Sequence, residues 1–123
     1  MPKTQTSIDP DAPFRPQMTA RDDAGHLHAI DRQTQARAFL AWSAARPRGR
    51  DGLNYGALGH VVDRLSTTRW SGKWAFGRLA DRMVQNLRKA DWIELNKPGR
   101  GWRLTETGAA ARDLLARRRQ AGK

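Results

Sequence analysis

Three side chains in the middle of this chain have the types and spacing that recognise planar polar groups. Arg78, Arg82 and Gln85 stand at positions i, i+4 and i+7, so they share one face if their segment is helical. An arginine fork can donate two parallel hydrogen bonds to guanine O6 and N7, and a glutamine amide can pair in the same way with adenine. The segment therefore predicts a surface able to contact base edges.

A second group of polar side chains has the chemistry to bind phosphate. Ser71 and Lys73 precede the arginines, and the backbone amides at a helix start there would hold a phosphate. Lys97 and Arg100 flank a Pro-Gly pair and would reach a nucleic-acid backbone or minor groove. Further phosphate contacts are expected from three arginines: Arg48, Arg50 and Arg69. Trp74 is a candidate for stacking on a sugar or base, with packing against a neighbouring helix as the alternative.

Other reactive constellations are missing from the sequence. Without cysteine there is no disulfide, thiolate zinc site or thiol nucleophile. His26, His28 and His60 suggest a metal site, but no acidic residue has a matching spacing, so we expect exposed histidines and no metal. No GxxxxGK[ST] loop and no strand-following GxGxxG occurs. We therefore expect neither a cofactor nor an enzymatic activity.

The charge balance indicates a polyanionic partner. Lys plus Arg is 23 and Asp plus Glu is 12, which gives a net charge of +11. Residues 1–25 carry a net −1, so the positive charge belongs to the rest of the chain. No apolar run is long enough to span a membrane, and the N-terminus lacks an apolar signal core. We expect a cytoplasmic, nucleoid-associated protein.

The supply of core residues is small but concentrated. Leu, Ile, Val and Phe account for only 20 of 123 residues, and a content below about 20% with high charge is typical of disorder. Eighteen Ala and five Trp add to them, and only Ile8 and Phe14 of the 20 precede Leu27. These counts predict a flexible arm over 1–25, a folded domain over 26–119 and a tail over 120–123. Because so small a domain is marginal alone, we expect a homodimer.

Periodicity predicts a mainly α chain with a small β-hairpin. Helices are expected over 31–46, 55–65, 71–90 and 106–118. Asp31 is the expected N-cap of the first helix, and Ser71 is that of the third. The inner face of the first comprises Ala36, Phe39, Leu40 and Ser43, and that of the third comprises Phe76, Leu79, Ala80, Met83, Val84 and Leu87. Strands are expected over 92–95 and 102–105, around a turn rich in Pro and Gly.

The order of these elements resembles that of a winged helix-turn-helix domain. Residues 87–95 (LRKADWIEL) resemble the end of a recognition helix passing into the first wing strand. Residues 101–109 (GWRLTETGA) resemble the second wing strand and the next helix, and RLTETG is similar to that junction in MarR- and PadR-type bacterial regulators. The resemblance covers about residues 54–116. Those families usually carry glycine in place of Asp91, and their turn before the recognition helix is commonly shorter than 66–70.

The resemblance implies a sequence-specific double-stranded DNA-binding protein, here a small bacterial or phage transcriptional regulator acting as a homodimer. Helix 71–90 would enter the major groove, which admits an α-helix, and the wing at 96–101 would contact the backbone or minor groove. Two alternatives stay open. One is an architectural or replication-associated nucleic-acid-binding protein of low specificity. The other is a basic interaction module or inhibitor that docks on an acidic partner protein.

Overall fold

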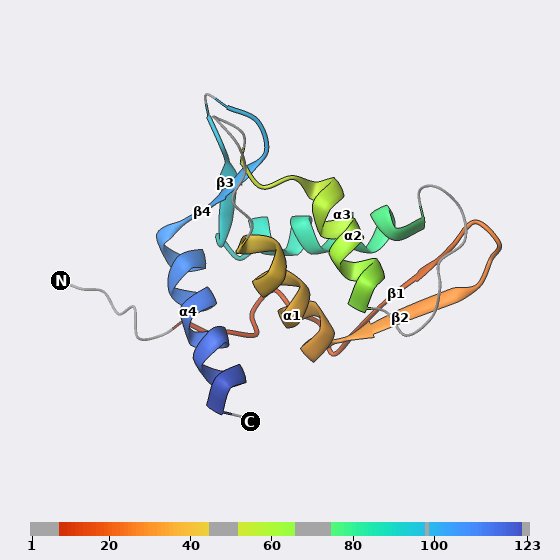
Figure 1. The fold of residues 1–123 in the computed structure, drawn as a ribbon, viewed down its shortest axis with the longest axis horizontal. Coiled ribbons are helices and arrows are strands. Elements are labelled where there is room, and N and C mark those ends of the chain that lie inside the picture. Colours follow the sequence, from red (N-terminus) through yellow and green to blue (C-terminus); the bar gives the residue numbers. More distant parts are fainter. Residues whose placement is uncertain (1–7, 45–51, 66–74, 98, 122–123) are drawn as a thin grey trace.

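The computed structural model describes four stretches of the chain: residues 8–44, 52–65, 75–97 and 99–121. Four helices lie in them: α1 (Arg32–Ser43), α2 (Tyr55–Leu65), α3 (Ala75–Lys89) and α4 (Glu106–Ala121). Two antiparallel strand pairs accompany the helices: β1 (Gln17–Arg21) with β2 (Leu27–Asp31), and β3 (Ile93–Leu95) with β4 (Trp102–Leu104). The described chain is thus mainly helical with two small hairpins (Figure 1).

Helix positions agree with the periodicity of the sequence. Asp31 caps α1 as predicted, because its carboxylate accepts a hydrogen bond of 2.7 Å from the main-chain nitrogen of Thr34. The predicted range of α2 is confirmed, and α4 extends through Ala121, so the predicted tail begins inside a helix. The predicted first turn of α3, at 71–74, lies outside the described residues, as does the loop at 66–70.

Residues 8–25 do not form the predicted arm. Met18 and Ala20 alternate with polar neighbours along β1 and are buried on one face of the hairpin, together with Ile30 of β2. Buried Gln35 of α1 exchanges two hydrogen bonds, of 2.9 and 3.0 Å, with the main chain of Arg15. This hairpin was not predicted because the segment is rich in proline and its apolar pattern is short. A five-residue strand has only two or three inward-facing positions, which is too few for a clear alternation.

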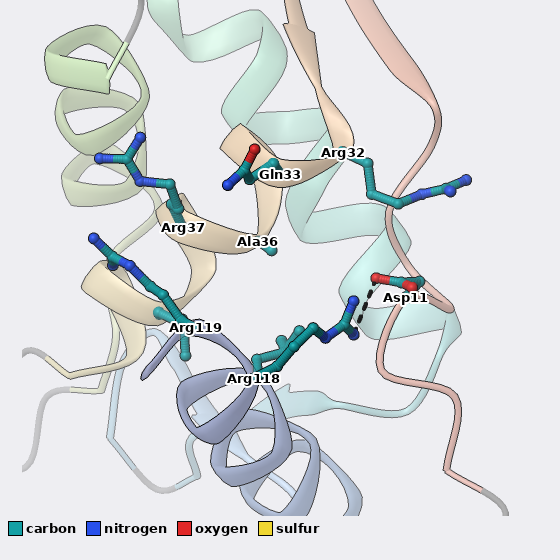
Figure 2. Close-up of a pocket in the computed structure, with 9 residues that line it drawn as sticks. Asp11, Arg32, Gln33, Ala36, Arg37, Arg118 and Arg119 are labelled. Carbon is teal, nitrogen blue, oxygen red and sulfur yellow. Dashed lines mark hydrogen bonds and ion pairs between the residues drawn. The ribbon is translucent and has the colours of Figure 1, made fainter. Parts of the chain in front are cut away.

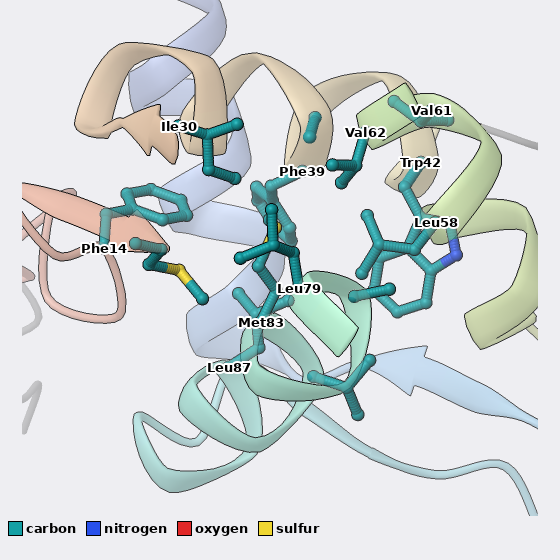
Figure 3. Close-up of a cluster of buried hydrophobic side chains, with 14 of the residues drawn as sticks. Phe14, Ile30, Phe39, Trp42, Leu58, Val61, Val62, Leu79, Met83 and Leu87 are labelled. Carbon is teal, nitrogen blue, oxygen red and sulfur yellow. The ribbon is translucent and has the colours of Figure 1, made fainter. Parts of the chain in front are cut away.

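The core joins this N-terminal segment to the helices (Figure 3). Phe14 is only 4% exposed and meets the Trp92 ring edge-on, at a centroid separation of 5.5 Å. Phe39 of α1 lies 5.2 Å from the same ring, so three segments distant in sequence share one aromatic cluster. The inner face of α1 is centred on Ala38, Phe39 and Trp42. Of the predicted inner residues, Phe39 and Ser43 are buried, whereas Ala36 and Leu40 are only partly buried.

The second hairpin is anchored on both sides. Leu53, just before α2, forms an antiparallel bridge with Trp102, and their main chains exchange hydrogen bonds of 2.7 and 2.9 Å. Gly108, in the first turn of α4, lies so close to Trp92 that an added Cβ would stand 2.0 Å from the Trp92 carbonyl oxygen. The glycine of the RLTETG run is therefore required by the approach of α4 to the start of β3.

Candidate nucleic-acid interface

The long helix α3 is amphipathic, as its sequence predicts. Its inner stripe is buried and comprises Leu79, Ala80, Met83, Val84 and Leu87. Its exposed residues comprise Arg78, Asp81, Arg82, Arg88 and Lys89, four cations and one acid. The side chain of Phe76 lies outside the described part. α3 packs mainly on α2, so its outer face is left to solvent and to the hairpin β1–β2.

Two predicted base-contacting arginines have partners inside the chain. Arg78 Nη1 donates to the carbonyl oxygen of Arg21, and Arg82 Nη1 donates to that of Thr19, both at 2.5 Å. Main-chain oxygens two residues apart on a strand point to the same edge, about 6.8 Å from each other. Helical residues four apart are separated by about 6 Å along the axis, so the two spacings match. The arginines therefore cover the open edge of β1.

An ion pair strengthens the same contact. The carboxylate of Asp23 lies 3.8 Å from Arg78, and both side chains are about half exposed. Sequence reasoning missed these partners because it assigned 1–25 to an arm. The available signal was the alternation of polar and apolar residues in Gln17–Arg21 and Leu27–Asp31 around an Asp- and Gly-containing turn.

Gln85 is half-buried and lies within reach of a neighbour on its own helix. Its Oε1 atom accepts a hydrogen bond of 3.1 Å from Arg88 Nη2, three residues further along the chain. Arg78, Arg82 and Gln85 thus follow one side of α3, but each has an intramolecular partner.

Hydrogen bonds from the side chain and the main chain of Asn96 cross the base of the basic hairpin tip. The Asn96 amide donates to the Arg100 oxygen at 3.0 Å, and the Asn96 main-chain nitrogen donates to Gly101, which has a φ of +83°. Lys97 and Arg100 are exposed at this tip, as predicted. On the adjoining strands, Arg103 and Glu94 form an ion pair of 2.7 Å. The exposed tip cations therefore lie next to residues that these hydrogen bonds hold together.

A tight turn connects α3 to β3. The main-chain nitrogens of Asp91 and Trp92 donate to the oxygens of Arg88 and Leu87, each at 3.0 Å. This is the Schellman arrangement, which places the residue after the C-cap in the left-handed region, and Asp91 has a φ of +65°. Asp91, where the resemblance to MarR- and PadR-type regulators led us to expect glycine, is thus held in a conformation that costs glycine least.

Six predicted contact residues lie outside the described residues: Arg48, Arg50, Arg69, Ser71, Lys73 and Trp74. Of the remaining tryptophans, Trp42 and Trp92 are buried in the core and Trp102 is half-buried. The indole nitrogen of Trp42 donates to the Asn54 oxygen at 2.7 Å, which links α1 to the start of α2.

The expectation of exposed histidines is wrong for His28. Its side chain is buried, and its Nε2 atom lies 2.7 Å from Oδ2 of the fully buried Asp22. Oδ1 of Asp22 accepts from the main-chain nitrogens of Ala24 and His26, so this carboxylate organises the β1–β2 turn. His26 is 77% exposed. Within the described residues, no cluster of three His, Cys, Asp or Glu side chains could hold a metal ion.

None of the helices in the described stretches is both long enough and apolar enough to cross a membrane. Comparisons of the chain with protein-family models, with curated proteins and with solved structures found no match.

Proposed function

We propose that this chain is a double-stranded DNA-binding protein of the winged helix-turn-helix type, acting as a small transcriptional regulator. The observation that carries the proposal is the outer face of α3, which bears four exposed cations and one exposed acid. This helix leads through the Asp91 turn into a hairpin whose exposed tip carries Lys97 and Arg100. A cationic helix of this kind has the dimensions and donors for the major groove, and the tip would contact the flanking backbone.

The anchoring of the hairpin supports the same assignment. The bridge between Leu53 and Trp102 ties β4 to the segment just before α2, so α2, α3 and the hairpin form one unit. A wing held in this way would keep its cations in a constant position relative to α3. Positioned phosphate contacts set the register in which a helix meets the bases.

The hairpin β1–β2 gives the predicted base-contacting arginines a second role. Only Nη1 of Arg78 and of Arg82 donates to β1, and a guanidinium carries five N–H donors. The remaining donors would meet the DNA while β1 restricts the rotamers of the two side chains. Such pre-organisation lowers the entropy lost on binding.

The first test is selection of random-sequence duplex DNA by the purified full chain at physiological salt with excess competitor DNA. The proposal predicts one enriched motif, and a palindrome would also support a homodimer. Binding without an enriched motif would favour the architectural alternative. No retention of DNA at all would overturn the proposal.

Variants of the two cationic regions separate their roles. Arg82→Ala is expected to relax sequence preference at one position, at a discrimination cost of about 1 to 3 kcal/mol. The double variant of Lys97→Ala and Arg100→Ala should weaken binding to all sequences alike. If about six cations neutralise phosphates, the plot of the logarithm of the binding constant against the logarithm of the salt concentration has a slope near −5. The double variant should make this slope shallower by about 2. Fluorescence anisotropy at several salt concentrations measures both quantities.

A further inference from the structure

A groove runs between α1 and α4, two helices that the proposed DNA contact does not use. A cavity of about 520 Å³ opens at one end, lined by both helices and by Asp11 (Figure 2). A second cavity of about 370 Å³ shares Leu40 and Arg119 with the first and continues to Ala44 and Arg112. The two cavities therefore lie next to each other along α1 and α4, and together they are called here the α1–α4 groove.

The floor of the α1–α4 groove is aliphatic and its rim is cationic. Ala36, Leu40 and Leu115 supply apolar surface. Five arginines line the two cavities: Arg32, Arg37, Arg112, Arg118 and Arg119. Asp11 is the one carboxylate among the described lining residues, and its distance to Arg118 is 3.5 Å. A ligand that complements the groove combines an apolar ridge with carboxylates on its flanks.

Arg37, which lines the groove, has one unsatisfied donor. Its Nε atom is buried and has no hydrogen-bond partner among the described residues. Buried donors in native proteins are almost always satisfied, so Arg37 has an unused donor beside the groove.

The α1–α4 groove is separate from the outer face of α3. In Figure 3 the ribbon of α1 lies above the buried side chains and the ribbon of α3 lies below them, so the two helices lie on opposite sides of the cluster. The α1 residues that line the groove are exposed or only partly buried, whereas the fully buried residues of α1, such as Ala38, Phe39 and Trp42, do not line it. A ligand in the groove would therefore leave the face of α3 that carries Arg82 open.

We propose that the α1–α4 groove binds an acidic amphipathic helix of a partner protein. The groove follows α1 from Arg32 to Ala44, which is about 18 Å or three helical turns, so a helix would occupy both cavities. Leu or similar side chains at i, i+4 and i+7 would rest on Leu40 and Leu115, and flanking Glu or Asp would pair with the arginines. A second copy of this chain is disfavoured as occupant by its net charge of +11.

The test uses the full chain and a fluorescent synthetic peptide of about four helical turns. The peptide has Leu on one face and Glu on the flanks, and a matched peptide has Gln in place of every Glu. The groove variants are Arg37→Glu and Arg119→Glu. The control variant is Arg117→Glu, which makes the same charge change on α4 at an exposed residue that lines neither cavity. Circular dichroism verifies that each variant is folded. If Arg37→Glu unfolds the chain, Arg119→Glu alone tests the groove, because Arg119 is exposed.

The proposal predicts that each groove variant weakens binding of the acidic peptide by about tenfold, which is the effect of losing one charge-assisted contact. The control variant Arg117→Glu should change the affinity by less than about twofold. The Gln peptide should bind about tenfold more weakly than the Glu peptide, and saturating duplex DNA should not displace the latter. The proposal would be overturned if Arg117→Glu and Arg119→Glu lowered the affinity for the acidic peptide equally. It would also be overturned if duplex DNA, or a small dicarboxylate at equal concentration, displaced the peptide. The peptide titration needs no DNA, so failure of the proposed DNA binding would leave this result unaffected.

Discussion

Arg82 on α3 donates a hydrogen bond of 2.5 Å to the carbonyl oxygen of Thr19 on β1, across 63 positions of sequence. Arg78 makes the parallel contact to Arg21, one helical turn earlier. The pair joins the hairpin β1–β2 to the helix proposed to contact DNA. Any change that weakens this contact is therefore expected to affect both the stability of the hairpin and the position of the two arginines.

Arg82→Ala should lower the free energy of unfolding by about 1 kcal/mol, because the bond is exposed and water can replace the lost donor. Arg88→Ala is the matched control, since Arg88 is exposed on the same helix and bonds only locally, to Gln85. Urea unfolding followed by circular dichroism measures both values. Equal effects of the two variants would show that the contact with β1 does not stabilise the fold.

Asp22→Ala should destabilise the chain by about 2 to 4 kcal/mol. The substitution removes the acceptor of two main-chain N–H groups and of His28 in a buried site. Asp23→Ala, at the adjacent half-exposed position, should change stability by less than about 0.5 kcal/mol. Thermal unfolding of the two variants compares them directly, and a small effect at Asp22 would contradict the role given to the buried carboxylate.

Two helical glycines should respond in opposite directions to alanine. Gly108→Ala should cost more than about 2 kcal/mol, because the added Cβ would stand 2.0 Å from the Trp92 oxygen and α4 must shift. At Gly77 the nearest atom is the Tyr55 hydroxyl at 3.6 Å, so alanine fits and should stabilise α3 by about 0.5 to 1 kcal/mol. Chemical denaturation of the two single variants tests both signs, and stabilisation by Gly108→Ala would refute the packing described.

The cap of α1 should show a defined pH dependence. The hydrogen bond from the Thr34 main-chain nitrogen lowers the pKa of Asp31, so its carboxylate binds a proton less readily in the folded state. The stabilisation is therefore present above the unfolded-state pKa of about 3.9 and is lost as the pH falls through the folded value. Asp31→Ala should cost about 1 kcal/mol at pH 7 and progressively less below about pH 4.

Asp31→Asn is the control for this dependence, because its amide oxygen also caps a helix and does not titrate. Urea unfolding between pH 3 and pH 7 gives the difference for each variant. If the cost of Asp31→Ala did not change over this range, another interaction of Asp31 would have to account for it.

Local signals in the sequence were sufficient for the helices and for the second hairpin. Asp31 as an N-cap, the apolar spacing from Leu79 to Leu87 and the glycines around residue 100 each act within a few residues. Their effects on backbone conformation therefore do not depend on the rest of the chain. The exposure of the α3 cations could also be predicted from the local pattern, because a helix with one apolar stripe buries that stripe and leaves its other face to solvent.

Tertiary structure alone decided which distant groups meet. The hairpin β1–β2, the burial of His28 on Asp22 and the contacts of Arg78 and Arg82 all depend on β1 lying beside α3. The α1–α4 groove likewise exists only because two helices separated by more than 60 residues lie side by side. Such contacts form because many weakly apolar residues together bury enough apolar area to stabilise them. That total depends on residues far apart in the chain, so it cannot be estimated from a short segment of sequence.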